Sequence, residues 1–140
     1  MTAKELLRKQ IDDVSYQLEK VLEGVSDSDL DFKLAPTVMT AREHVVHLCE
    51  VYTAVEEGSR GVEHAWGTYD VADRSWTQLK PLFESLRARA VEIVTSSDDD
   101  KSLLSGTGFI VNHDSYHVGQ LSSIRIALDS TWDPYCIYAH

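Results

Sequence analysis

The spacing of apolar residues along the chain predicts helices rather than strands. Apolar residues recur every three or four positions in four segments, and no segment alternates with period two for long enough to form a sheet. The predicted helices cover residues 3–22, 40–58, 75–95 and 108–128. Their inward stripes are Leu7, Ile11, Val14, Leu18 and Val21; Ala41, Val45, Leu48, Tyr52 and Val55; Leu79, Leu82, Leu86, Ala90 and Ile93; and Ile110, Leu121, Ile124 and Leu128. We therefore expect an all-α fold, an antiparallel four-helix bundle.

Polar and glycine residues mark the ends of these helices. Gly24 ends the first helix, and Thr40 with Glu43 fits a capping box at the start of the second. The segment 58–75 is predicted to be a long loop, and loops of this length in compact domains are often functional. The tail 129–140 is aromatic, which indicates that it covers the bundle or the mouth of a pocket; its deletion should then lower the stability of the protein.

Two histidines fall on the predicted inward stripe of the fourth helix. His113 and His117 complete an unbroken three-four spacing with the apolar residues around them, so both rings should point into the core. A buried imidazole without partners costs roughly 1–3 kcal/mol. Residues four apart stack on one face of a helix, which lets both rings bind one metal ion. The alternative is two separate histidines, each bonded to a carbonyl or side chain.

A third ligand for such an ion is available on the second helix. His44 lies close to the inward stripe at about 100° per residue, whereas His47 lies toward its edge, so periodicity alone favours His44. A site with three protein ligands keeps an open position for water or substrate, as in catalytic zinc sites.

The histidine motifs resemble those of the DinB-like superfamily, which includes YfiT-type proteins. The first matching run is His47-Leu48-Cys49-Glu50, and the second is the 113–120 segment with His113, His117, Gly119 and Gln120. Residues 22–33 also look like the link between the first two helices of that family. The resemblance implies that His47, His113 and His117 bind one divalent ion, nickel or zinc, with His44 as the fallback to His47.

The resemblance further implies a metal-dependent transferase that activates a low-molecular-weight thiol, such as bacillithiol or mycothiol, for S-transfer or detoxification. Two alternatives stay open: a metal-dependent hydrolase of a small ester or amide, and a non-catalytic metal-binding stress protein. Catalytic residues are not identified, but Gln120, Tyr116 and Tyr52 are candidates to contact the ligands or the substrate. Glu50 is the nearest acid to His47 in sequence, yet helical geometry points it away from the inward stripe.

Composition and charge narrow the class of protein. A chain of 140 residues with 43% apolar residues is predicted to be one domain, residues 1–140. The net charge of −10 argues against a nucleic-acid partner, and no apolar run is long enough to span a membrane. The acidic run at residues 97–100 is expected to be a solvated loop. Two cysteines without a disulfide framework suit a cytoplasmic protein.

The remaining predictions concern single residues. Cys49 is expected to be a buried small apolar side chain rather than a nucleophile. His64 and His140 are expected to face solvent. Val46 and Val118 fall off their inward stripes and should point outward, and the family resemblance implies a homodimer without indicating which helices meet.

Overall fold

The structure is a computed structural model that describes residues 1–138, and the described part is helical without strands. Four long helices form the body of the molecule. They are α1 (Ala3–Leu22), α2 (Ala41–Ser59), α3 (Trp76–Thr95) and α5 (His113–Leu128). The shorter elements are the 3-10 helices η1 (Ser28–Asp31) and η3 (Pro134–Tyr138), the helix α4 (Asp100–Ser105) and the π-helix η2 (Gly106–Asn112). The all-α prediction is therefore confirmed over these residues.

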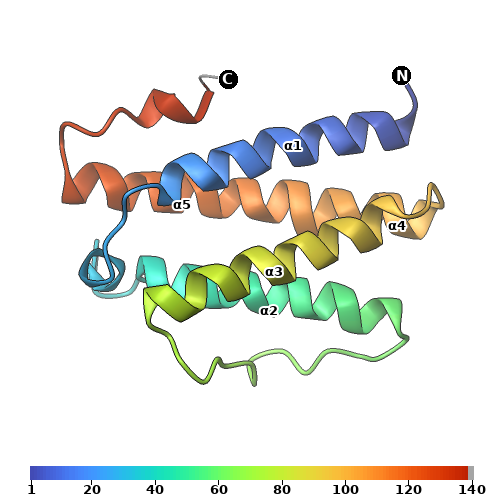
Figure 1. Cartoon of the computed structure of the whole chain (residues 1–140), viewed down its shortest axis with the longest axis horizontal. Coiled ribbons are helices and arrows are strands. Elements are labelled where there is room, and N and C mark those ends of the chain that lie inside the picture. The colour runs from blue at the N-terminus through green and yellow to red at the C-terminus, as the bar shows by residue number, and fades with distance from the viewer. Residues whose placement is uncertain (139–140) are drawn as a thin grey trace.

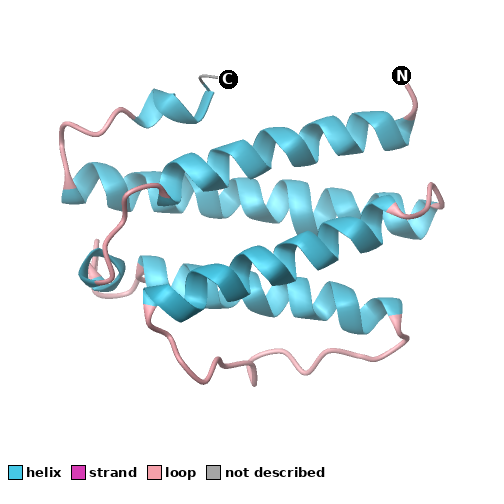
Figure 2. Ribbon diagram, in the orientation of Figure 1, coloured by secondary structure: helices cyan, strands magenta, loops and turns pink. Residues whose placement is uncertain are grey.

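The long helices lie side by side as two pairs, as Figures 1 and 2 show. Helices α1 and α5 run in one direction, and α2 and α3 run in the opposite direction. The 60–75 loop makes this possible, because it returns along the whole bundle before α3 begins (Figure 1). An extended chain of that length reaches roughly 50 Å, against about 30 Å for a helix of twenty residues. Helices of different pairs are therefore antiparallel, as expected, whereas the two helices within each pair are parallel.

The core is formed by the predicted stripes of α1 and α2, with α3 turned slightly from its predicted orientation. All five stripe residues of α1 are buried, and so are those of α2. In α3 the buried residues are Leu79, Phe83, Ala90 and Val94, whereas Leu86 and Ile93 are partly buried against the core. Val46 and Val118 are buried at 7% and 3% exposure, so the prediction that they point outward is wrong. Neighbouring elements cover helix sides that an isolated helical projection leaves open.

The beginning of the last helical segment differs most from its prediction. The chain becomes helical at Asp100 rather than 108, and the acidic residues 98–100 are exposed, as expected of a solvated run. Asp99 caps α4 by accepting a hydrogen bond of 2.7 Å from the backbone amide of Ser102. The π-helix η2 then leads directly into α5. Within η2, Gly106 approaches α1 closely: a Cβ atom there would lie 2.7 Å from Cδ2 of Leu7.

The C-terminal tail packs on the bundle, with η3 against α1. Ile137 is buried, and Trp132 packs against the core with the guanidinium of Arg125 5.0 Å from its ring. The sequence predicted that the tail covers either the bundle or the mouth of a pocket, and the structure shows that it covers the bundle. His140, expected to face solvent, lies outside the described residues.

Candidate metal centre

Three histidines from two helices meet beside the core. His47 comes from α2, and His113 and His117 come from α5. The ring centroids of His47 lie 5.2 Å from His113 and 5.4 Å from His117, and those of His113 and His117 are 4.5 Å apart. One potential ligand atom from each side chain lies within 4.8 Å of the others. The structure therefore brings together the set that the resemblance implied.

Burial keeps the two α5 histidines neutral, which is the state that binds metal. It lowers the pKa of His113 to about 4 and that of His117 to about 3, with a further effect of neighbouring histidine charges. The Nε2 atoms of the two rings face each other at 3.2 Å, and Nδ1 of His113 is buried without a hydrogen-bond partner. Neutral imidazoles with unsatisfied nitrogens fit a divalent ion of the nickel or zinc type.

The potential ligand nitrogens of the three histidines lie slightly farther apart than they would around a bound ion. Two nitrogens about 2.1 Å from one tetrahedral ion lie roughly 3.4 Å apart. His113 and His117 are already at that spacing. The side chain of His47 is 35% exposed, so its ring has room to rotate toward the other two.

His44 contacts this cluster without being one of the three. It is 4% exposed, as its place on the inward stripe predicted, and its Nδ1 lies 2.7 Å from Nδ1 of His117. Desolvation lowers the pKa of His44 and so favours its neutral form, which lets the two facing Nδ1 atoms share one proton. When that proton is on Nδ1 of His117, its Nε2, which faces His113, is free to bind a metal ion. A ring held in this way by its second nitrogen is typical of metal-binding histidines.

Glu50 lies beside His47, although helical geometry directs it away from the inward stripe of α2. Its carboxylate is nearly buried, with Oε1 3.5 Å from Nδ1 of His47. Oε2 accepts hydrogen bonds from Nε2 of His64 at 2.9 Å and from the amide of Gly67 at 3.3 Å. Burial alone would raise the pKa of Glu50, but the bonds from His64 and Gly67 outweigh it and lower the pKa. The burial of Glu50 was not predicted, because helical periodicity does not show that the 60–75 loop covers this face of α2.

His64 is the residue that sequence reasoning missed. Its side chain is 7% exposed instead of solvent-facing, and its second nitrogen, Nδ1, lies 3.0 Å from Oε2 of Glu57. The ring of Trp66 packs edge-on against it at 4.5 Å. The hydrogen bond with Glu50 is the main cause that raises the pKa of His64. The one feature of the sequence that could have indicated a role for His64 is its position in a long loop, because loops of this length are often functional.

The other candidate residues lie in different surroundings. The hydroxyl of Tyr52 donates to Oδ1 of the fully buried Asp114 at 2.7 Å, rather than to a histidine. Tyr116 is 61% exposed with its ring 5.2 Å from that of His117. Gln120 is half-buried one turn beyond His117. Cys49 is buried, and desolvation raises the pKa of its thiol to about 12, which agrees with an unreactive side chain.

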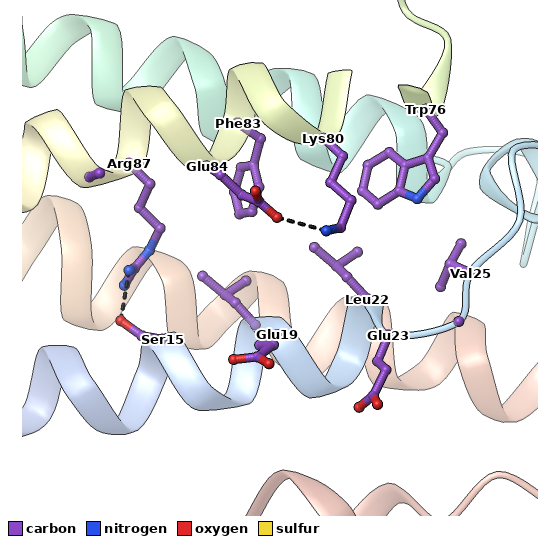
Figure 3. Close-up of a pocket in the computed structure, with 13 residues that line it drawn as sticks. Ser15, Glu19, Leu22, Glu23, Val25, Trp76, Lys80, Phe83, Glu84 and Arg87 are labelled. Carbon is purple, nitrogen blue, oxygen red and sulfur yellow. Dashed lines mark hydrogen bonds and ion pairs between the residues drawn. The ribbon is translucent and has the colours of Figure 1, made fainter. Parts of the chain in front are cut away.

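Two cavities flank the core. The first, about 530 Å³, lies between α1 and α3, and Figure 3 shows Arg87 bonded to Ser15 at one end of it. Arg87 also donates to Asp114 at 3.0 Å. The second, about 540 Å³, is lined by His64, Trp66 and residues of α2, α3 and η2. Neither is lined by the three clustered histidines, but His64 joins the second cavity to Glu50 and hence to His47.

A comparison with known protein families decides the assignment. The model of the DinB superfamily matches residues 10–121, which contain both histidine motifs and most of the helical body. The chain belongs to the DinB superfamily. No curated protein and no solved structure matches it. Within residues 1–138 of this DinB chain, no helix is long and apolar enough to cross a membrane.

Proposed function

We propose that this DinB-superfamily protein binds one divalent metal ion through His47, His113 and His117 and uses it to activate a low-molecular-weight thiol for S-transfer. The convergence of three imidazoles from α2 and α5 carries the proposal. With three neutral nitrogen ligands, a bound ion would keep an open position and stabilise a thiolate there at neutral pH.

The protein's own side chains support this assignment by fixing ring orientation. His44 bonds Nδ1 of His117, and Glu50 lies against Nδ1 of His47. The first contact leaves Nε2 of His117 facing His113, and the second favours a proton on Nδ1 of His47, which would leave its Nε2 free for a metal ion. Such supporting residues typically change metal affinity by 10–100-fold when they are removed.

Thiol transfer is favoured over hydrolysis by the state of the nearby acids. A bound ion lowers the pKa of its water only to about 7, so a hydrolase gains from a base within reach of that water. Glu50 is already bonded to His64 and Gly67, and Asp114 is buried between Tyr52 and Arg87. Both carboxylates are engaged, whereas a bound ion would deprotonate a coordinating thiol outright, with the proton released to solvent.

The first test is the metal content of the purified, untagged protein by inductively coupled plasma mass spectrometry. We expect about one ion per chain in the wild type, loss of the ion in His47→Ala and His113→Ala, and weaker but retained binding in His44→Ala. Circular dichroism of each variant checks that it is folded. A wild type that stays metal-free after reconstitution with nickel or zinc would remove the basis of the proposal.

The second test concerns the reaction. The loaded protein is assayed against electrophiles with several thiols and without thiol. Thiol-dependent turnover that is lost in His113→Ala supports the transferase, whereas turnover without thiol would identify a hydrolase. Metal binding with no turnover would leave a binding protein.

A further inference from the structure

The 60–75 loop is tied to α2 by one buried side chain. His64 enters between two acids of α2, with Nε2 2.9 Å from Glu50 and Nδ1 3.0 Å from Glu57. Both ring nitrogens therefore face carboxylate oxygens, and both donate when the ring is protonated, the form that Glu50 and Glu57 favour by raising the pKa of His64. The side chain is 7% exposed and Trp66 packs on it, so His64 holds this part of the loop against α2.

The bond to Glu50 continues toward the metal-binding histidines. Glu50 presents one oxygen to His64 and the other to Nδ1 of His47, which lies 3.5 Å away. The amide of Gly67, also in the loop, donates to the oxygen that His64 binds. A carboxylate held on one side has a fixed orientation on the other, as in the carboxylate-histidine pairs of metal sites.

We propose that His64 is a positioning residue of the metal centre, which orients His47 by holding Glu50. The inference rests on the proposed metal site and adds the loop to it. The side chain of His47 is 35% exposed, so its ring has room to turn toward the other two histidines. Without His64, Glu50 would be free to turn to solvent, and Nδ1 of His47 would lose the carboxylate that favours a proton on that nitrogen.

Two substitutions at His64 separate this role from loop anchoring. In His64→Gln, the amide nitrogen lies as many bonds from Cβ as Nε2 of histidine and can donate to Glu50. In His64→Asn, the amide lies where Nδ1 was and can reach only toward Glu57. Glu57→Gln is the matched control, because it weakens the other anchor of the loop and leaves the bond between His64 and Glu50 in place.

The readouts are the affinity for Co²⁺, followed by its visible absorption, and the tautomer of His47 in the metal-free protein by long-range ¹H–¹⁵N NMR. We expect His64→Asn to weaken Co²⁺ binding by about 10–100-fold and to lower the fraction of His47 with the proton on Nδ1. His64→Gln should restore much of both properties, and Glu57→Gln should resemble the wild type.

Equal Co²⁺ affinity and an unchanged His47 tautomer in His64→Asn would overturn the inference. So would equal losses in His64→Asn and Glu57→Gln, because they would indicate general loosening of the loop. If the wild type bound no metal, the proposed function would fail, yet the tautomer comparison would still decide whether His64 orients His47.

Discussion

Removal of one hydroxyl from the core should measure how strongly the buried polar network holds the helices together. Tyr52 on α2 donates a hydrogen bond of 2.7 Å to Asp114 on α5, and the two residues are 1% and 0% exposed. In Tyr52→Phe the aromatic ring can keep its packing beside Phe83, 5.9 Å between centroids, but Oδ1 of Asp114 loses its donor. No solvent reaches this oxygen to replace the bond.

The expected loss follows from the kind of bond. A hydrogen bond to a charged group contributes about 1.5–3 kcal/mol, so we expect Tyr52→Phe to lower the free energy of unfolding by about 2 kcal/mol. An unfolding entropy of about 2.1 cal/mol/K per residue converts this to a decrease in melting temperature of roughly 7 °C for this chain.

The pH dependence provides a second check. Burial raises the pKa of Asp114 to about 6, against the opposing effects of Arg87 and Tyr52. The carboxyl is therefore mainly ionised at pH 8 and protonated at pH 5, and the cost of the substitution should be larger at pH 8. Urea unfolding of metal-free protein at both pH values measures it, with Tyr135→Phe, which is 73% exposed in the wild type, as the control. A loss below about 0.5 kcal/mol at pH 8, the range of ordinary surface substitutions, would refute the reasoning.

Two further predictions concern packing and pH. Gly106→Ala should destabilise the protein by about 1–2 kcal/mol in urea unfolding, because the new Cβ would lie 2.7 Å from Leu7. The control is Gly108→Ala, which should be neutral or slightly stabilising because a Cβ there meets nothing within 4 Å. Equal effects of the two substitutions would contradict the close approach of Gly106 to α1. Burial, helped by neighbouring histidine charges, lowers the pKa of His117 to about 3, below its unfolded value near 6.5. The contribution of His117 to stability is therefore present above pH 6.5 and is lost as the pH falls below that value. His117→Gln should flatten the loss of stability measured for metal-free protein between about pH 7 and 5, and an unchanged slope would count against burial of a neutral ring.

Much of the fold was predictable because the helices are amphipathic and capped by local signals. The predicted bounds of the first helix match those of α1, and Thr40 caps α2 by accepting from the amide of Glu43, as one half of the predicted capping box requires. The direction of α3 was not predictable from periodicity, since a loop of this length permits either direction. The short α4 and the π-helix η2 were also missed, because their pattern is too short or has a different period.

The candidate site was also predictable from the sequence only in part. His113 and His117 stand one turn apart on a single helix, so the sequence alone predicted that they share a face. His47 required either the family resemblance or the tertiary structure, because periodicity favoured His44. The role of these residues as ligands stays a prediction, but their meeting is a feature of the fold.

The sequence by itself determined what depends on neighbours a few residues apart: the four long helices, most of their buried faces and the paired imidazoles of α5. Only the tertiary structure decided what depends on distant segments meeting, namely the parallel course of α2 and α3, the bond between His44 and His117, and the enclosure of Glu50 by His64. The physical reason is that helical periodicity fixes the direction of a side chain from its own axis. Whether that direction leads to solvent, to a loop or to another histidine is set by the packing of the rest of the chain.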